Sequence, residues 1–160
     1  AVEYLAEGNP FNGNASVLVS FRHLDIILIA DYETGSISWE YGPGELTGQH
    51  NPTLLENGNI LVFDNRKAGQ GSRVAEIFPE TGEIVWEYEE SDFYASHISG
   101  AQRLLDGNTL ICEGPDGRIF EVDQEGTIVW EHFSPDDAQV FRAYRYEVED
   151  VEWPDLSIFE

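Results

Sequence analysis

The chain repeats itself at intervals of 44 to 49 residues, and this repeat constrains its fold more than any other feature. The first landmark is a Trp that follows a Gly by four residues; it occurs at Trp39, Trp86 and Trp130, spaced by 47 and 44 residues. The second is an Asn-Gly-Asn or Asp-Gly-Asn turn whose glycines are Gly13, Gly58 and Gly107, spaced by 45 and 49 residues. Because two separate landmarks share one period, the chain consists of repeats of one structural unit.

Each repeat contains short apolar runs that are separated by tight turns. The turn Asn57-Gly58 precedes the run Ile60-Leu61-Val62-Phe63, and Asn-Gly supplies the positive φ that a two-residue hairpin requires. Helical periodicity is limited to a weak pattern in residues 136–145. Four antiparallel strands in each repeat predict an all-β fold, a partial β-propeller of about three to four four-stranded antiparallel blades. We expect the recurring Trp to pack between neighbouring sheets.

We expect residues 1–160 to form a single partial propeller domain. The expected repeat units are residues 1–21, 22–65, 73–113 and 117–147, and residues 148–160 form an acidic C-terminal tail. At roughly 47 residues per blade, the chain holds little more than three blades, whereas closed propellers have about four to eight. The open edges of such an arrangement need a partner. We therefore expect association with further blades or self-association into an oligomer.

The charge balance excludes several classes of partner. The chain carries 31 acidic residues against 8 basic ones, a net charge of -23, which repels nucleic acid and anionic lipid surfaces. No apolar stretch is long enough to span a membrane. One cysteine, Cys112, excludes an internal disulfide framework and argues against a structural zinc site. So acidic a surface favours a salt-adapted protein whose stability rises with salt.

Several segments resemble the arylsulfotransferase family of six-bladed propellers. These segments are residues 20–25, 48–52, 57–65, 99–104, 106–111 and 117–122. The glycine and tryptophan spacings also occur in quinoprotein-type propellers, so Gln49-His50 and the run from Ser20 to Asp25 are the more specific part of the resemblance. The resemblance extends over nearly all of residues 1–146.

The resemblance implies a reaction in which a sulfuryl group passes from an aryl sulfate to a phenol through a sulfated histidine. No cofactor and no nucleotide donor are implied. The family also implies an extracellular or periplasmic location, although the start of the chain, Ala1-Val2-Glu3, shows no signal-peptide pattern and suggests a processed or cut end. A His-x-Asn segment expected directly before Val2 does not occur in this sequence.

Histidine is nucleophilic near neutral pH, and a sulfonate needs fixed donors such as arginine. His50 directly precedes an expected inner strand, and His97 lies two residues before the equivalent position of the next repeat. The expected catalytic residues are His50 and His97, and the expected substrate-binding residues are Arg66, His23, Arg22 and Asn65. Arg73 and Arg118 begin equivalent strands, which indicates a structural role, and no metal-binding motif is present.

Two alternatives compete with the enzymatic interpretation. Propeller blades can serve as a non-catalytic binding or assembly module that self-associates through its open sheets. A quinoprotein-like cofactor propeller is the third possibility and ranks last, because three blades cannot surround a quinone and no metal-binding set accompanies them.

Overall fold

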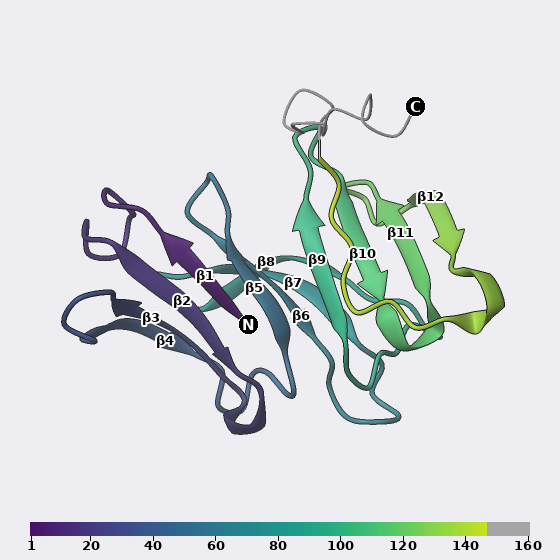
Figure 1. Cartoon of the computed structure of the whole chain (residues 1–160), viewed down its shortest axis with the longest axis horizontal. Helices are drawn as coiled ribbons and strands as arrows, with labels where there is room; N and C mark the ends of the chain where they lie inside the picture. Colours follow the sequence, from purple (N-terminus) through teal and green to yellow (C-terminus); the bar gives the residue numbers. More distant parts are fainter. Residues whose placement is uncertain (147–160) are drawn as a thin grey trace, which may run out of the picture.

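The computed structural model describes residues 1–146, which form three four-stranded antiparallel sheets (Figure 1). The first sheet contains β1 (Val2–Leu5), β2 (Ser16–Phe21), β3 (Ile26–Asp31) and β4 (Ile37–Tyr41). The second contains β5 (His50–Leu54), β6 (Ile60–Asp64), β7 (Arg73–Phe78) and β8 (Glu83–Tyr88), and the third contains β9 (Ser99–Arg103), β10 (Thr109–Glu113), β11 (Arg118–Val122) and β12 (Ile128–Phe133). The predicted all-β partial propeller is therefore confirmed.

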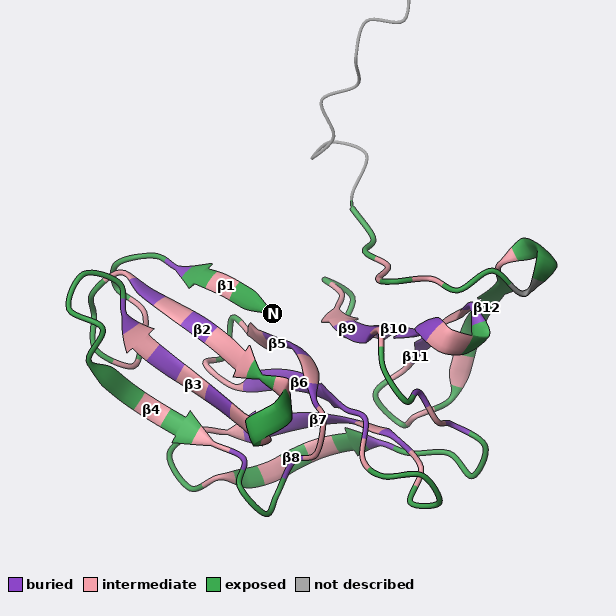
Figure 2. Ribbon diagram, turned by 60° about the horizontal axis from the view of Figure 1, so that its bottom comes forward, coloured by how far each residue is buried: buried purple, intermediate pink, exposed green. Residues whose placement is uncertain are grey.

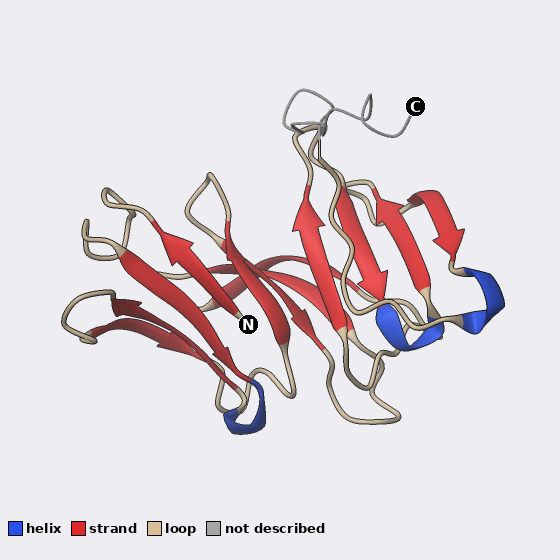
Figure 3. Cartoon of the chain, in the orientation of Figure 1, coloured by secondary structure: helices blue, strands red, loops and turns tan. Residues whose placement is uncertain are grey.

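Each sheet is a simple meander in which consecutive strands pair. The first strands of the sheets, β1, β5 and β9, lie innermost, and β5 contacts both of the others (Figure 2). Three short 3₁₀ helices complete the described fold: η1 (Arg22–Leu24), η2 (Gly114–Asp116) and η3 (Pro135–Asp137) (Figure 3). None of the helices in residues 1–146 is long and apolar enough to cross a membrane.

The sheets occupy different ranges from the repeat units that the sequence predicts. The hydrogen-bonded sheets run over residues 2–41, 50–88 and 99–133, so the expected unit 22–65 combines strands of two sheets. A periodic pattern gives the length of a repeat but not the point at which one sheet ends and the next begins, which explains the difference. The expected tail, residues 148–160, lies outside the described residues.

The Asn-Gly-Asn landmark has a second role beyond the hairpin turn. In each sheet the side-chain amide of the Asn that directly follows the turn glycine donates a hydrogen bond to a carboxylate on the third strand. The pairs are Asn14 with Asp31 at 3.0 Å, Asn59 with Glu76 at 2.6 Å and Asn108 with Glu121 at 2.7 Å. All three carboxylates are largely buried, so the asparagine offsets part of the cost of removing them from water.

The core consists of two layers, one in each gap between neighbouring sheets. Between the first and second sheets lie Leu5, Leu18, Ile27, Ile29, Leu46, Ile60, Val62, Ala75 and Ile77. Between the second and third lie Leu61, Phe63, Val74, Tyr88, Phe93, Ala95, Ala101, Ile111, Phe120 and Val122. The second sheet therefore buries both of its faces, which is why β6 is a continuous apolar run from Ile60 to Phe63 and does not alternate with polar residues.

Two of the recurring tryptophans pack between sheets as the repeat predicts. The indole nitrogen of Trp39 donates to the carbonyl of Pro79, in the turn between β7 and β8, at 3.0 Å, and that of Trp86 donates to the carbonyl of Gln124, in the turn between β11 and β12, at 2.9 Å. The prediction is wrong for Trp130, whose side chain is 44% exposed on β12. Trp39 and Trp86 each pack against the following sheet, and the third sheet is the last one that the structure describes.

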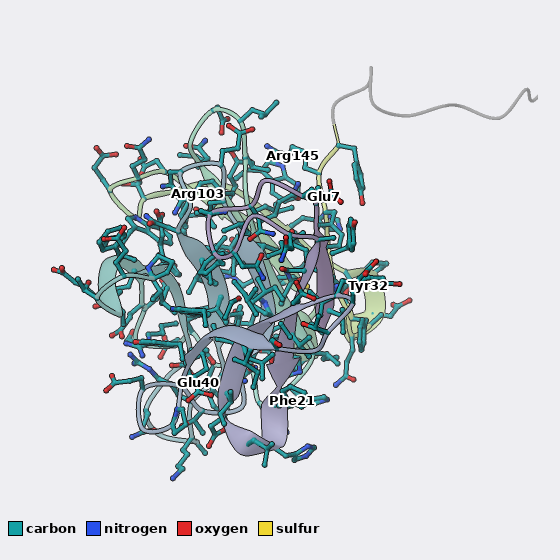
Figure 4. All side chains as sticks on the ribbon, turned by 90° about the vertical axis from the view of Figure 1, so that its left-hand side faces the viewer. Glu7, Phe21, Tyr32, Glu40, Arg103 and Arg145 are labelled. Atoms are coloured by element: carbon teal, nitrogen blue, oxygen red, sulfur yellow. The ribbon has the colours of Figure 1, made fainter. Side chains whose placement is uncertain are left out.

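An arginine joins the second and third sheets beside Trp86. Arg103 of β9 pairs with Glu76 of β7 at 2.8 Å, and its guanidinium lies 4.5 Å from the centroid of the Trp86 ring. Arg145 makes the same pair of contacts with Glu121 and Trp130, and both arginines lie toward the same end of the molecule in Figure 4.

Replacing Arg103 with Met is expected to lower the free energy of unfolding by about 2 kcal/mol, because it leaves the largely buried Glu76 without its cation. Arg66→Met is the matched control. Its closest partner Glu89 is well exposed, and the buried Asp64, 3.8 Å from Arg66, keeps Arg73 at 3.0 Å, so the expected loss is below about 1 kcal/mol. Urea unfolding of the two variants measures both values, and equal losses would contradict the structural role of Arg103.

Candidate functional site

The ring of His50 is held in place by Asn65 at the start of the innermost strand of the second sheet. His50 begins β5, and Asn65 directly follows the end of β6, the neighbouring strand. The His50 Nδ1 and Asn65 Oδ1 atoms are 2.6 Å apart. The Asn65 amide nitrogen donates to the Ala95 carbonyl at 2.6 Å and to the Ser99 hydroxyl at 3.0 Å. Asn65 is buried, so this network also ties the second sheet to the third.

These contacts determine the tautomer of His50. A backbone carbonyl can only accept a hydrogen bond, so the Asn65 atom that faces Ala95 must be the amide nitrogen. The Asn65 atom that faces His50 is then the carbonyl oxygen, which also can only accept. Nδ1 of His50 therefore carries the proton, and Nε2 of the neutral ring carries a free lone pair. The arrangement leaves Nε2 as a nucleophile.

The surroundings of His50 favour this neutral form. Burial lowers the pKa of His50 below its ordinary value, and the nearby cation of Arg22 lowers it further, against the opposing effect of the hydrogen bond to Asn65. Burial penalises the charged form of the ring because it removes the imidazolium from water. His50 is therefore unprotonated at neutral pH.

Arg22 provides positive charge beside His50. It lies in η1, directly after β2, and its Nη2 donates to the carbonyl of Ser96 at 3.0 Å. A Cβ at Gly48 would lie 3.7 Å from this guanidinium and 3.8 Å from Asn65, so Arg22 and Asn65 flank the same glycine. The Nε of Arg22 is buried and has no hydrogen-bond partner within residues 1–146. Arg22 as a whole is half-buried, so part of its guanidinium can be approached by an oxygen of a ligand.

The segment before His50 is fixed to the turn that carries Arg22. The backbone N–H of Gly48 donates to the Asp25 carboxylate at 2.8 Å. The buried side chain of Gln49 donates to the Ile26 carbonyl at 2.9 Å and to the Ser20 hydroxyl at 3.2 Å. These bonds explain why residues 20–25 and 48–50 belong together although they are far apart in the sequence.

The other residues proposed from the sequence lie in different surroundings. His97 is exposed, with its Nδ1 2.7 Å from the Ser96 hydroxyl, on the loop whose carbonyl binds Arg22. His23 is exposed on η1. Arg66 points to carboxylates instead of an open site, because it pairs with Glu89 at 2.5 Å and lies 3.8 Å from Asp64. The structure therefore brings together His50, Asn65 and Arg22.

Three residues that sequence reasoning missed also reach this region. The hydroxyl of Tyr144 donates to the Asn51 side chain at 3.1 Å, next to His50. Arg142 in turn donates from Nη1 to the Tyr144 hydroxyl at 3.0 Å. Tyr144 and Arg142 come after the last described strand, outside the clear repeat, so no repeat position marked them. Asn51 adopts a left-handed backbone conformation, with φ of 51°, which sequence patterns do not identify.

The described residues offer nitrogen donors to an anion more readily than ligands to a cation. Within residues 1–146, no group of three or more His, Cys, Asp and Glu side chains is arranged to hold a metal ion. The guanidinium of Arg22 beside Gly48 instead suits a negatively charged group next to His50.

Comparison with known proteins gives one family and several similar structures. The family model described as arylsulfotransferase (ASST) matches residues 11–134. A protein of unknown function from Bacteroides caccae matches with a TM-score of 0.55 and 19% identity, covering 74% of this chain and 42% of that one. The Dos1 propeller matches with a TM-score of 0.58 and 13% identity, covering 87% of this chain and 36% of that one. The chain thus spans less than half the length of either structure. No curated protein matches it.

Proposed function

Because the chain belongs to the arylsulfotransferase family, whose model covers residues 11–134, we propose that it transfers a sulfuryl group from an aryl sulfate to a phenol through His50. The observation that carries this proposal is the fixed ring of His50, in which Asn65 accepts a hydrogen bond from Nδ1–H and leaves the Nε2 lone pair free. A nucleophile that is held in one orientation by a neighbouring group is the usual arrangement for covalent catalysis.

The proposed reaction has two steps. In the first, the Nε2 lone pair of His50 attacks the sulfur of the aryl sulfate, the N–S bond forms, and the S–O bond to the aryl group breaks, so that the phenolate leaves with the bonding pair. In the second, the oxygen of the acceptor phenol attacks the same sulfur, the N–S bond breaks, and the pair returns to Nε2. The phenol proton passes to solvent. Asn65 accepts the hydrogen bond from Nδ1–H throughout and so stabilises the cationic ring of the intermediate.

Arg22 is the residue of this site that suits the sulfonate oxygens. Its Nε–H has no protein partner within the described chain, and its charge lies close enough to affect His50. A guanidinium next to the nucleophile lowers the cost of bringing an anion into a protein whose net charge is -23.

The assay that tests the function is release of 4-nitrophenol from 4-nitrophenyl sulfate in the presence of a second phenol as acceptor. The proposal requires release that depends on the acceptor, with the sulfate recovered on it. Release without any sulfated acceptor would indicate hydrolysis, and no release at all would remove the enzymatic proposal.

The family resemblance extends the proposal to an extracellular or periplasmic location, which fractionation of cells would test.

The rate of sulfuryl transfer is expected to fall only when the pH drops below the ordinary pKa of histidine. Only neutral His50 has the Nε2 lone pair, and its pKa is lowered by burial and by Arg22. The acid limb of kcat/KM is therefore expected below about pH 6.5, the ordinary value for histidine. Arg22→Gln should move this limb to higher pH, because it removes one cause of the lowered pKa. A pH–rate profile of both proteins measures this, and a limb at or above the ordinary value in the unchanged protein would contradict it.

A second candidate function, assembly with further blades or with another copy, has its own observation. Trp130 is 44% exposed at the position where Trp39 and Trp86 pack against a following sheet. At the opposite end of the fold, Tyr4 and Tyr32 are 61% and 64% exposed, with ring centroids 5.8 Å apart. Exposed aromatic side chains of this kind are common at protein interfaces.

If assembly occurs, light scattering at micromolar concentration should give a defined oligomer. Trp130→Ser is then expected to weaken association by about 10- to 100-fold, the effect of removing a central aromatic contact. Val85→Ser is the matched control, since Val85 is 50% exposed on the outer strand β8. A monomeric unchanged protein, or equal effects of the two substitutions, would contradict assembly through the third sheet.

A further inference from the structure

We propose that two residues of the segment after the last strand, residues 138–146, belong to the same site: Arg142 binds the sulfonate group of the substrate, and Tyr144 holds Arg142 in position. This inference rests on the proposed function of His50. It adds a second arginine, from a part of the chain outside the repeat, to the group that receives the anion.

The segment is fixed to the third sheet at both ends. The backbone N–H of Val140 donates to the Gly114 carbonyl at 2.9 Å. Further along, the Gln102 side chain makes two bonds with the backbone of Arg145, at 2.8 and 2.9 Å. Figure 1 shows this segment, in yellow, returning from η3 and running beside β9. The chain between the two attachments therefore has a defined course along the innermost strand of the third sheet.

Between these attachments the segment reaches across to the second sheet. The Tyr144 hydroxyl donates to the side-chain oxygen of Asn51 at 3.1 Å, and Asn51 is the residue after His50. Asn51 is only 3% exposed, and its oxygen lies against Gly100 of β9, where a Cβ would come within 2.9 Å of it. The absence of a side chain at Gly100 therefore lets Asn51 lie between the two innermost strands and meet Tyr144.

Arg142 differs from most arginines of this protein in its partners. Five of the seven arginines pair with carboxylates: Arg66, Arg73, Arg103, Arg118 and Arg145. Within residues 1–146, Arg22 and Arg142 form no ion pair, although the chain has 31 acidic residues. Both also have a buried Nε that lacks a hydrogen-bond partner in the described part of the chain.

Arg22 and Arg142, which form no ion pair within residues 1–146, both lie near the start of β5. Arg22 lowers the pKa of His50, and Arg142 reaches Asn51 through Tyr144. Two guanidinium groups with free N–H donors, in a protein that otherwise neutralises its arginines, fit an anionic ligand with several oxygens. A sulfonate on an aromatic ring has this chemistry. The Tyr144 hydroxyl accepts a hydrogen bond from Arg142 and donates one to Asn51, so we assign it as a positioning residue.

The test is equilibrium binding of 4-nitrophenyl sulfate by calorimetry in the His50→Ala background, in which the proposed turnover is removed. Arg142→Gln is expected to weaken binding by about 10- to 100-fold, the loss of one charged hydrogen bond. Tyr144→Phe should weaken it less, and Arg145→Gln, which removes the same charge from the same segment, should change it by less than about 2-fold. Binding of 4-nitroanisole, which has the same ring but no ionisable group, should be the same with and without the Arg142→Gln substitution.

Equal weakening by Arg142→Gln and Arg145→Gln, or no weakening by either, would overturn the inference. Failure of this inference can be distinguished from failure of the proposed function. If the unchanged protein fails to transfer sulfate while Arg142→Gln still weakens binding of the aryl sulfate and not of 4-nitroanisole, the anion site stands and the transferase proposal falls. If transfer depends on His50 but Arg142→Gln leaves binding of the aryl sulfate unchanged, the transferase proposal stands and the role of Arg142 falls.

Discussion

Replacing His50 with Ala is expected to reduce sulfuryl transfer by about 10³-fold or more, because it removes the nucleophile on which the two-step reaction depends. His50 is the candidate whose ring is fixed by a buried partner, Asn65, and whose pKa is lowered so that it stays neutral. The loss should appear in kcat, with a smaller effect on KM, since Arg22 and the rest of the site remain. Acceptor-dependent release of 4-nitrophenol measures both constants.

His97→Ala is the matched control for this prediction. His97 is exposed and contacts Ser96, so its removal should change the rate by less than about 10-fold. A variant His50→Ala that retains full activity would contradict the assignment. If His97→Ala alone abolished transfer, the nucleophile would lie on the 89–98 loop instead of β5.

Phe93→Ala is expected to cost about 3 to 5 kcal/mol of unfolding free energy, the range for truncating a fully buried Phe. Phe93 is completely buried, and its ring centroid lies 5.3 Å from Phe63, 5.5 Å from Tyr88 and 5.7 Å from Phe120. The ring fills the gap between the second and third sheets, so its removal leaves a cavity that rigid strands on both sides cannot close. Urea unfolding followed by tryptophan fluorescence measures the loss.

Phe141→Ala provides the comparison, because Phe141 is 69% exposed and its loss should be within about 0.5 kcal/mol. Similar losses for the two variants would mean that the layer around Phe93 does not hold the sheets together.

Phe93 also affects the position of the site residues. It lies two residues before Ala95, whose carbonyl fixes Asn65, so partial unfolding of this layer should also release His50.

The architecture could be predicted from the sequence because each landmark has a local physical cause. The Asn-Gly turns require positive φ, and Trp39 and Trp86 fill space between neighbouring sheets, so both landmarks recur with the period of the fold. The division of the repeat into sheets could not be predicted, since strand pairing depends on which hydrogen bonds form between distant segments. The exposure of Trp130 could not be predicted either, because it depends on whether another sheet packs against β12, and no local pattern contains that information.

The candidate site was only partly accessible to sequence reasoning. His50, Asn65 and Arg22 lie in segments that carry the family resemblance, and the structure places them around Gly48. The sequence suggested Arg66 as an anion-binding residue because it follows Asn65. In the structure Asn65 contacts His50, whereas Arg66 lies near the carboxylates of Asp64 and Glu89. Arg142 lies 92 positions from His50, and only the course of the folded chain brings its segment back to β5.

The net charge of -23 does not by itself exclude an anionic substrate. Most arginines lie against carboxylates, and the two that form no ion pair within residues 1–146 are the two connected to His50 and its neighbour. A strongly negative protein can therefore still bind an anion at one place, if two guanidinium groups there have no carboxylate partner of their own.

A sulfated histidine can be observed from the mass of the protein after brief reaction with 4-nitrophenyl sulfate in the absence of an acceptor phenol, followed by peptide mapping at neutral to alkaline pH. We expect the gain of one sulfuryl group, located on His50, which disappears when phenol is added and never forms in His50→Ala. An unchanged mass in protein that transfers sulfate, or a sulfuryl group on any other residue, would contradict catalysis through His50.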